Sequence, residues 1–383
     1  MFPAKNGDSL LITLMGDENT NLLVDGGYGV TYRNSIRRKL KNLASEGEAI
    51  DLLIATHIDS DHIGGLIALL RENENAASAK VIPIQAIWHN SLSCLVSDSM
   101  NDDDLSAPDT ELLEGICRRG MRQPEDGTTS EISAAQGSSL ASLIRSGNYL
   151  WNANTSIMAG HSREINSDWQ IRVIGPPIER LTSLREWWIA KIRGLGFDSE
   201  LSSSPLMQNV FEFLSSYQTP LKETEEISGA TEDAILSDIY KSDKSVTNGS
   251  SISFVLQGNN KKILFLGDSW AEDAISGLDS LAHDEGIEIF DAIKVSHHGS
   301  YRNTSPELLS RVDSEKYLIS TDGSKHSHPD WPVLRAIVDR PAEFTRSLIF
   351  NYRTEIVERI EAYQSNAAHE FDVVVKQNEP IQL

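Results

Sequence analysis

Short apolar runs alternate with amphipathic segments at the start of the chain. Residues 9–16 and 21–27 each carry an apolar run, and the polar loop between them predicts a β-hairpin. Residues 33–44 have the apolar spacing of an amphipathic helix with a basic face. Residues 51–57 are continuously apolar, which is typical of a buried strand, and residues 62–75 return to a helical spacing. This alternation predicts a mixed α/β fold.

The same alternation continues at residues 81–90 and returns in the C-terminal part. Further strands are expected over residues 81–90, 251–258, 261–268, 289–298, 316–323 and 347–353. Helices are expected between the later strands, at residues 270–286 and 305–312. The two strand-rich parts therefore have the same organisation.

Residues 90–247 interrupt this pattern. An acidic stretch (Asp102–Asp104) and a polar stretch (residues 122–130) come first. Helices are expected at 131–147, 179–194 and 222–240, with an isolated strand at 169–177. We interpret residues 1–383 as a single α/β domain that carries 90–247 as an insertion or cap. A separate domain is the alternative.

Composition narrows the class of protein. The 383 residues are 39% hydrophobic, which is enough apolar material for a sizeable core and excludes wholesale disorder. Cys94 and Cys117 form no CxxC motif, which excludes a disulfide framework and a cysteine-based zinc cluster. No apolar run approaches the length of a membrane span, and the first residues do not resemble a secretory signal. We therefore expect a cytoplasmic protein without a membrane partner.

The charge balance restricts the substrate. The chain has 34 Lys and Arg against 56 Asp and Glu, a net charge of −22. Such a surface repels nucleic acids and anionic membranes at long range. A nucleic-acid substrate would therefore have to be held by a local basic patch, by metal ions or by a partner.

The strand at 51–57 runs directly into a dense group of metal-ligand side chains. His57, Asp59, Asp61 and His62 lie within six residues, before two glycines and a helix. His and Asp are ligands of first-row divalent metals, and a loop at the end of a strand can direct all four to one place. An Asp-rich helix N-cap with two ordinary polar histidines is the alternative interpretation.

Further acidic and histidine residues follow other expected strands. They are Asp25, Asp268, the pair His297 and His298, and the pair His326 and His328. Because each of these residues or pairs ends a strand, we expect all of them at one edge of a sheet sandwich. Isolated histidines in unrelated loops would not be distributed in this way.

The order of these motifs resembles the metallo-β-lactamase superfamily, which implies a four-layer αββα sandwich with the metal site at one edge. Within the superfamily, the chain is most similar to the hydrolase domain of the competence channel protein ComEC. The motifs that carry the resemblance are Asp8 in NGDSLLI, Asp59, Gly267–Asp268, His297–Ser300 and His328–Pro329. Together they span about residues 1–90 and 246–350.

The resemblance implies a site for two divalent metal ions. His57 and Asp59 would bind the first ion, and Asp61 and His62 the second. Asp268 would bridge them.

The remaining ligands follow from the same resemblance. His297 would complete the second metal site, with His298 the less favoured of the pair, and Asp25 would orient the metal-binding loop from behind. The superfamily's usual histidine before the GD strand is replaced here by Asn248 or a small neighbour. The first site is then rich in oxygen ligands, which favours Mn²⁺ or Mg²⁺, although Zn²⁺ remains an alternative.

Such a pair of ions suits phosphodiester hydrolysis, because it activates a water and neutralises charge on the phosphate oxygens. Asp61 would accept a proton from that water, and His328 would donate a hydrogen bond or proton to the substrate. A surface histidine is the alternative interpretation of His328. Arg302 and Lys325 are the candidate phosphate contacts.

Other residues have plainer interpretations. The basic segment Arg37–Lys39, with Arg33, is expected to be a solvated helix face rather than a binding site. We expect Trp187 and Trp188 to pack rather than stack on bases, and His89 to be structural.

Two further classes of function stay open. The chain could hydrolyse a small ester, lactone or cyclic nucleotide, with residues 90–247 as a lid. It could also be a sensor or scaffold subunit activated by a partner. Residues 87–91, 134–144 and 175–188 resemble stand-alone hydrolases of AVAST-type anti-phage defence operons, which implies a STAND NTPase as that partner.

Overall fold

The computed structural model describes residues 1–96, 105–120, 139–152, 155–202, 204–216, 234–281, 286–325 and 327–383. Within these residues the strands form two large sheets and one small one. The four-stranded sheet has the order β1-β2-β3-β4, with β1 (Leu10–Leu14), β2 (Thr20–Val24), β3 (Leu52–Ala55) and β4 (Ile87–His89). Strands β1 and β2 pair antiparallel, as the hairpin prediction requires, and β3 and β4 add in parallel.

The larger sheet of the described residues has eight strands in the order β14-β13-β12-β10-β8-β7-β6-β5. Its strands are β5 (Ser162–Glu164), β6 (Trp169–Gly175), β7 (Ser253–Gly258), β8 (Lys261–Phe265), β10 (Ala292–Lys294), β12 (Lys316–Ile319), β13 (Arg346–Phe350) and β14 (Phe371–Val375). The small sheet pairs β9 (Glu288–Phe290) with β11 (Val312–Ser314).

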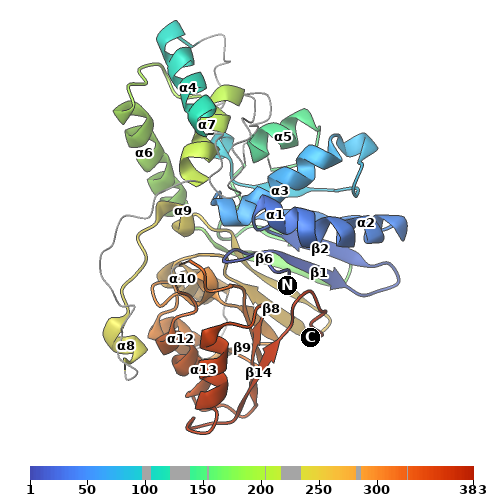
Figure 1. Ribbon diagram of the computed structural model, residues 1–383, viewed down its shortest axis with the longest axis vertical. Coiled ribbons are helices and arrows are strands. Elements are labelled where there is room, and N and C mark those ends of the chain that lie inside the picture. Colours follow the sequence, from blue (N-terminus) through green and yellow to red (C-terminus); the bar gives the residue numbers. More distant parts are fainter. Residues whose placement is uncertain are drawn as a thin grey trace.

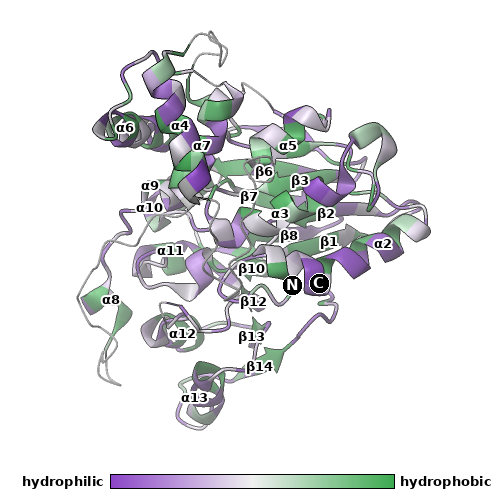
Figure 2. Ribbon diagram, turned by 45° about the horizontal axis from the view of Figure 1, so that its top comes forward, coloured by the Kyte–Doolittle hydropathy of each residue, from purple (hydrophilic) through white to green (hydrophobic). Residues whose placement is uncertain are grey.

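The two large sheets pack face to face, with helices outside both (Figures 1 and 2). Between the sheets, Leu22 and Ile54 of the smaller sheet share one apolar cluster with Phe254 and Phe265 of the larger sheet. Figure 2 shows the hydrophobic residues concentrated on the strands, whereas an outer helix such as α2 carries both hydrophobic and hydrophilic residues. The order helix, sheet, sheet, helix is the predicted αββα sandwich.

Different helices cover the two outer faces. The smaller sheet is covered by α1 (Gly29–Thr31), a π-helical turn (Tyr32–Ile36), α2 (Arg37–Ser45), α3 (Ser60–Asn73) and α5 (Leu140–Ser146). The larger sheet is covered by α10 (Ala271–Leu281), α11 (Pro306–Arg311), α12 (Trp331–Val338) and α13 (Glu355–Tyr363). Helix α3 buries Ile63, Leu66, Leu69 and Leu70, the helical spacing that predicted it.

Part of the middle segment forms a helical cluster of its own. Helices α4 (Ala107–Gly120), α6 (Ile178–Gly194) and α7 (Pro205–Ser216) meet around Leu113, Trp188 and Phe211, at one end of the sandwich (Figure 1). Two short helices follow, α8 (Leu236–Ile239) and α9 (Val246–Gly249). The acidic stretch Asp102–Asp104 and the polar stretch 122–130 lie outside the described residues. Of the two helices expected at 131–147 and 222–240, residues 131–138 and 222–233 lie outside them as well, and the remaining parts contain α5 and α8.

The strand expected at 169–177 is confirmed as β6, but it is not isolated. Strand β6 pairs antiparallel with β7 over most of its length, so it belongs to the larger sheet. The partner lies some eighty residues further along the chain, and local periodicity contains no information on so distant a pairing.

Two other strands are shorter than expected. Strand β4 covers only the end of residues 81–90, because Pro83 offers no backbone N–H to a ladder. The strand expected at 289–298 divides at Asp291 into β9 and β10, which belong to different sheets. Within the described helices, none combines the length and apolar character that crossing a bilayer requires.

Candidate metal centre

The acidic and histidine residues singled out in the sequence meet at one edge of the sandwich, around Asp268. This residue follows β8, and its carboxylate is buried. Among the described residues, four histidine Nε2 atoms surround its Oδ2 atom. The distances are 3.4 Å from His62, 3.7 Å from His297, 3.8 Å from His57 and 3.9 Å from His298. Two of these rings come from the smaller sheet's loops and two from the larger sheet's.

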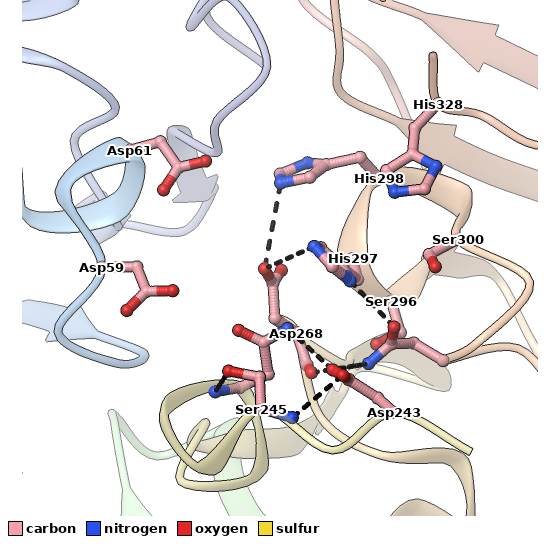
Figure 3. Close-up of polar contacts among 12 residues, drawn as sticks. Asp59, Asp61, Asp243, Ser245, Asp268, Ser296, His297, His298, Ser300 and His328 are labelled. Carbon is pink, nitrogen blue, oxygen red and sulfur yellow. Dashed lines mark hydrogen bonds and ion pairs between the residues drawn. The ribbon is translucent and has the colours of Figure 1, made fainter. Parts of the chain in front are cut away.

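Two more carboxylates face this cluster. Figure 3 shows Asp59 and Asp61 on one side of Asp268 and the pair His297 and His298 on the other. The Oδ2 atom of Asp59 lies 3.6 Å from Nε2 of His57 and accepts a 3.2 Å hydrogen bond from the Thr247 hydroxyl. Both acidic residues stand at the start of α3, so that short helical turn contributes ligands from several positions at once.

Among the described residues, three triplets of side chains have the spacing of metal ligands, the last of them being Asp8, Asp25 and His62. His57, His62 and Asp268 each offer a ligand atom within 4.8 Å of the others, and all three are buried. Asp61, His62 and His298 form the second triplet at the same spacing. The sequence favoured His297 over His298 as a metal ligand, but His298 lies as close to the site as His297 does.

Several polar atoms of the cluster are buried without a hydrogen-bond partner among the described residues. The Nε2 atoms of His57, His62 and His298 and the Oδ1 atoms of Asp59 and Asp268 are buried without a hydrogen-bond partner. Buried polar atoms are almost always paired, because desolvation without a partner is costly. A divalent cation satisfies all of these atoms at once, and imidazole nitrogen with carboxylate oxygen is a suitable donor set for it. The residues therefore fit the metal ions that the sequence implies.

On the side of the smaller sheet, Asp25 fixes the histidine rings from behind. Its Oδ2 atom lies 2.8 Å from Nδ1 of His62 and accepts a 2.7 Å hydrogen bond from the Thr56 hydroxyl. That hydroxyl lies 3.1 Å from Nδ1 of His57. Asp25 therefore holds both rings with Nε2 directed at Asp268.

On the side of the larger sheet, the rings have other partners. Nδ1 of His297 lies 2.8 Å from Oδ1 of Asn303, and Nδ1 of His298 lies 2.8 Å from the Ser320 carbonyl. Asn303 in turn donates a 3.0 Å hydrogen bond to the buried carboxylate of Asp243. Asp243 and Asn303 were not singled out in the sequence, because neither follows a strand or forms part of a recognisable motif.

Asn248 also contacts Asp243. Its Nδ2 atom donates a 2.7 Å hydrogen bond to Oδ2 of Asp243, which places it behind the metal-facing atoms. Its neighbour Thr247 contacts Asp59 directly. The carboxylate of Asp59 therefore has one hydroxyl and one imidazole beside it.

A buried ion pair lies beneath His298. Nζ of Lys294 lies 2.6 Å from Oδ2 of Asp8, whose Oδ1 lies 3.4 Å from Nδ1 of His298. Burial alone would raise the pKa of Asp8, but Lys294 and His298 hold it far below its usual value. A lysine inside the apolar strand β10 is the sequence signal that would have indicated this pair.

Electrostatics within the cluster favour charged forms. Burial opposes ionisation of Asp268, but His62, His297 and His298 hold its pKa well below the usual value. Burial likewise works to lower the pKa of His62, while Asp268 and Asp25 raise it well above the ordinary value. The carboxylates therefore favour the protonated form of the His62 ring.

Of the candidate substrate-facing residues, His328 lies beside His297. The His328 ring centroid is 5.3 Å from that of His297, and its Nδ1 atom lies 3.3 Å from Oδ2 of Asp330. Burial is the main cause of its lowered pKa. Arg302 adjoins Asn303, and its carbonyl accepts a 3.1 Å hydrogen bond from the Asp243 backbone. Lys325 is exposed, and His326 lies outside the described residues.

The plainer interpretations of other residues agree with the structure. Nε2 of His89 lies 2.9 Å from the buried carboxylate of Glu212. Trp188 is fully buried in the helical cluster of α4, α6 and α7, with Trp187 packed against it. Arg37 binds Glu72 through two hydrogen-bonding nitrogens on an exposed surface, which is typical of a solvated helix face. Within the described residues, neither Cys94 nor Cys117 forms a disulfide.

Comparison with known proteins supports the same class. Residues 4–117 match the family model of the metallo-beta-lactamase superfamily. No curated protein sequence matches the chain. The matched segment contains His57, Asp59, Asp61 and His62, and the fold brings Asp268, His297 and His298 to them from outside it. The chain has the metallo-β-lactamase fold, and its site has the residues of a metal-dependent hydrolase.

Proposed function

We propose that the chain is a metal-dependent phosphodiesterase with nucleic acid as its substrate. The observation that carries the proposal is the arrangement around Asp268, where buried imidazole and carboxylate atoms converge without other partners. His57, Asp59 and Asp268 would hold one ion, and Asp61, His62, Asp268 and one or both of His297 and His298 the other. Bound divalent ions would activate a water and neutralise charge on the phosphate.

Protein residues supply the remaining steps. Asp61 is half-buried at the start of α3, and we propose that its carboxylate accepts a proton from the attacking water. His328 lies beside His297 and has a lowered pKa, so its ring is mostly neutral near pH 7. A neutral ring favours hydrogen bonding to the substrate over donation of a proton.

A phosphodiester is favoured by two cations that stand close to site residues in the sequence of an otherwise acidic protein. Arg302 is the neighbour of Asn303, the residue that holds His297, and Lys325 precedes His328 by three residues. These side chains would contact the phosphates on either side of the reacting one. The donor set proposed for the first ion, one imidazole with two carboxylates, supports Mn²⁺ as the preferred ion, with Mg²⁺ and Zn²⁺ as competitors.

The test is hydrolysis by chelator-stripped protein to which Mn²⁺, Mg²⁺ or Zn²⁺ is added separately. Substrates are single- and double-stranded DNA and RNA, a chromogenic phosphodiester and a chromogenic carboxylic ester. We expect Mn²⁺-dependent cleavage of nucleic acid that is lost in Asp61→Ala and Asp268→Ala. Asp17→Ala, at an exposed position in the turn between β1 and β2, is the matched control. Hydrolysis of the ester alone would contradict the proposal.

We also propose that this hydrolysis serves anti-phage defence together with a STAND NTPase, and this part rests on the resemblance of the middle segment to AVAST-type hydrolases. The test is phage infection of cells that carry the gene with its operon neighbours. Protection should be lost when Asp268 is replaced by Ala. Equal protection by that variant would contradict a role for hydrolysis.

A further inference from the structure

The loop that precedes β1 lies against the start of α3, where Asp61 stands. Nδ2 of Asn6 donates a 2.8 Å hydrogen bond to Oδ2 of Asp61. On its other side, Oδ1 of Asn6 accepts a 3.0 Å hydrogen bond from the Tyr28 hydroxyl. Asn6 and Tyr28 are each only 7% exposed. The three side chains form one chain of hydrogen bonds that ends on a carboxylate of the candidate metal centre.

The direction of this chain is fixed by chemistry. An ionised carboxylate only accepts hydrogen bonds, so the amide nitrogen of Asn6 has to face Asp61. The amide oxygen is then left for Tyr28, whose hydroxyl can donate to it. Aligned donors of this kind polarise one another, which strengthens the bond at the carboxylate. Asn6 therefore has one orientation in which both of its ends are satisfied.

The backbone of the loop is held at the same place. The N–H of Asp8 donates a 3.2 Å hydrogen bond to the Asp61 carbonyl, and the Asp8 carbonyl accepts a 2.7 Å bond from Gly27. A Cβ atom on Gly7 would lie 2.0 Å from the Asp61 carbonyl oxygen, so this approach requires glycine. Asn6 is thus presented to Asp61 by a loop whose next two residues, Gly7 and Asp8, lie against the Asp61 carbonyl.

We propose that Asn6, held by Tyr28, is a positioning residue that fixes the Asp61 carboxylate for ion binding. The proposal for Asn6 rests on the proposed function in one respect, namely that Asp61 takes part in the metal centre. By engaging Oδ2, Asn6 restricts rotation of the carboxylate and leaves its remaining acceptor capacity for the site. Such supporting hydrogen bonds typically change metal affinity by about 10–100-fold.

The experiment measures Mn²⁺ binding to the full-length, chelator-stripped protein by calorimetry, together with the thermal midpoint. The variants are Asn6→Ala, Tyr28→Phe and the double variant, with Asn42→Ala on the exposed face of α2 as the matched control. We expect Asn6→Ala to weaken Mn²⁺ binding by about 10–100-fold. Tyr28→Phe should weaken it less, because Asn6 can still donate to Asp61.

The double variant separates positioning from packing. Because Tyr28 acts on Asp61 through Asn6, removing its hydroxyl should change Mn²⁺ affinity no further once Asn6 is Ala. A merely structural role would instead give additive losses of thermal stability with unchanged Mn²⁺ affinity. Affinities within twofold of the wild type in both single variants would overturn the proposal.

The readout does not require turnover. Failure of the wild type to cleave phosphodiesters would contradict the proposed function while leaving the Mn²⁺ titration intact. Tyr28→Phe keeps the loop and the amide in place, so it tests the proposal even if Asn6→Ala does not fold. Where the wild type is active, kcat should fall in Asn6→Ala with little change in KM, because Asn6 does not contact substrate.

Discussion

Nδ1 of His62 lies 2.8 Å from Oδ2 of Asp25, and both side chains are buried. The same carboxylate reaches His57 through the Thr56 hydroxyl, so one acidic residue orients two rings of the candidate metal centre.

Replacing Asp25 with Asn should weaken divalent-metal binding. The amide keeps the shape of the side chain but removes the charge that holds the proton on Nδ1 of His62. Loss of such a partner typically weakens metal affinity by about 10–100-fold. Calorimetric titration with Mn²⁺ checks this, with Asp17→Asn as control. An unchanged affinity would show that the rings orient without Asp25.

Metal binding should release protons. The pKa of His62 is raised well above its ordinary value by Asp268 and Asp25 against the effect of burial, and the pKa of His297 is raised by Asp268 and Asp243. A histidine with a raised pKa keeps its proton near neutral pH, and an ion displaces that proton when it binds. Metal affinity should therefore fall as the pH is lowered.

Proton release is measured by repeating the calorimetric titration at pH 7 in buffers of different ionisation enthalpy. The apparent binding enthalpy should change in proportion to the buffer's ionisation enthalpy. Identical enthalpies in all buffers would mean that the rings are already neutral before the ion binds.

A buried ion pair on the far side of the larger sheet should contribute to stability. Nε of Arg346 donates a 2.9 Å hydrogen bond to Asp313, and both side chains are buried. Asp313→Asn leaves this guanidinium without its counter-charge, and breaking a buried pair in this way costs about 3–5 kcal/mol. Urea denaturation at pH 7 measures the loss, and a loss below about 1 kcal/mol would contradict it.

The same pair predicts how stability depends on pH. Burial opposes ionisation of Asp313, but Arg346 and Arg340 hold its pKa below the ordinary value of 3.8. A depressed pKa stabilises the folded state above pH 3.8 and loses that contribution as the pH falls through the folded-state pKa. Between pH 5 and pH 3 the wild type should therefore lose more stability than Asp313→Asn. Parallel losses would assign the acid sensitivity to other carboxylates.

Gly65 should not tolerate a side chain. A Cβ atom there would lie 1.9 Å from the Gly26 carbonyl oxygen, where α3 packs against the loop that carries Asp25. Gly65→Ala should destabilise the protein by about 1–3 kcal/mol, because the helix has to move away. Gly115→Ala is the matched control, since its Cβ meets nothing within 4 Å in α4. Equal thermal midpoints for the two variants would contradict this packing.

The sequence predicted the fold where local patterns determine it. The β1–β2 hairpin, the buried strand β3 and the helix α3 follow from periodicity alone, and the αββα order followed from the resemblance that their motifs carry. The pairing of β6 with β7 was missed, because contacts between strands far apart in the chain leave no local signal.

The candidate site shows the same division. His57, His62 and Asp268 could be singled out because they end strands in recognisable motifs. Asn6, Asp243 and Asn303 could not, since single polar residues in loops look alike until the fold brings them together. The positions of His297 and His298 depend on the turn after β10, where both residues have positive φ, and sequence spacing alone could not separate them.

The most direct test of the central claim is anomalous X-ray diffraction from crystals soaked in Mn²⁺, with data collected on both sides of the manganese absorption edge. We expect anomalous peaks beside the Asp268 carboxylate and within coordination distance of the Nε2 atoms of His57 and His62. We also expect these peaks to disappear in Asp268→Ala crystals. Peaks only at surface carboxylates, or peaks at the site that persist without Asp268, would contradict the account.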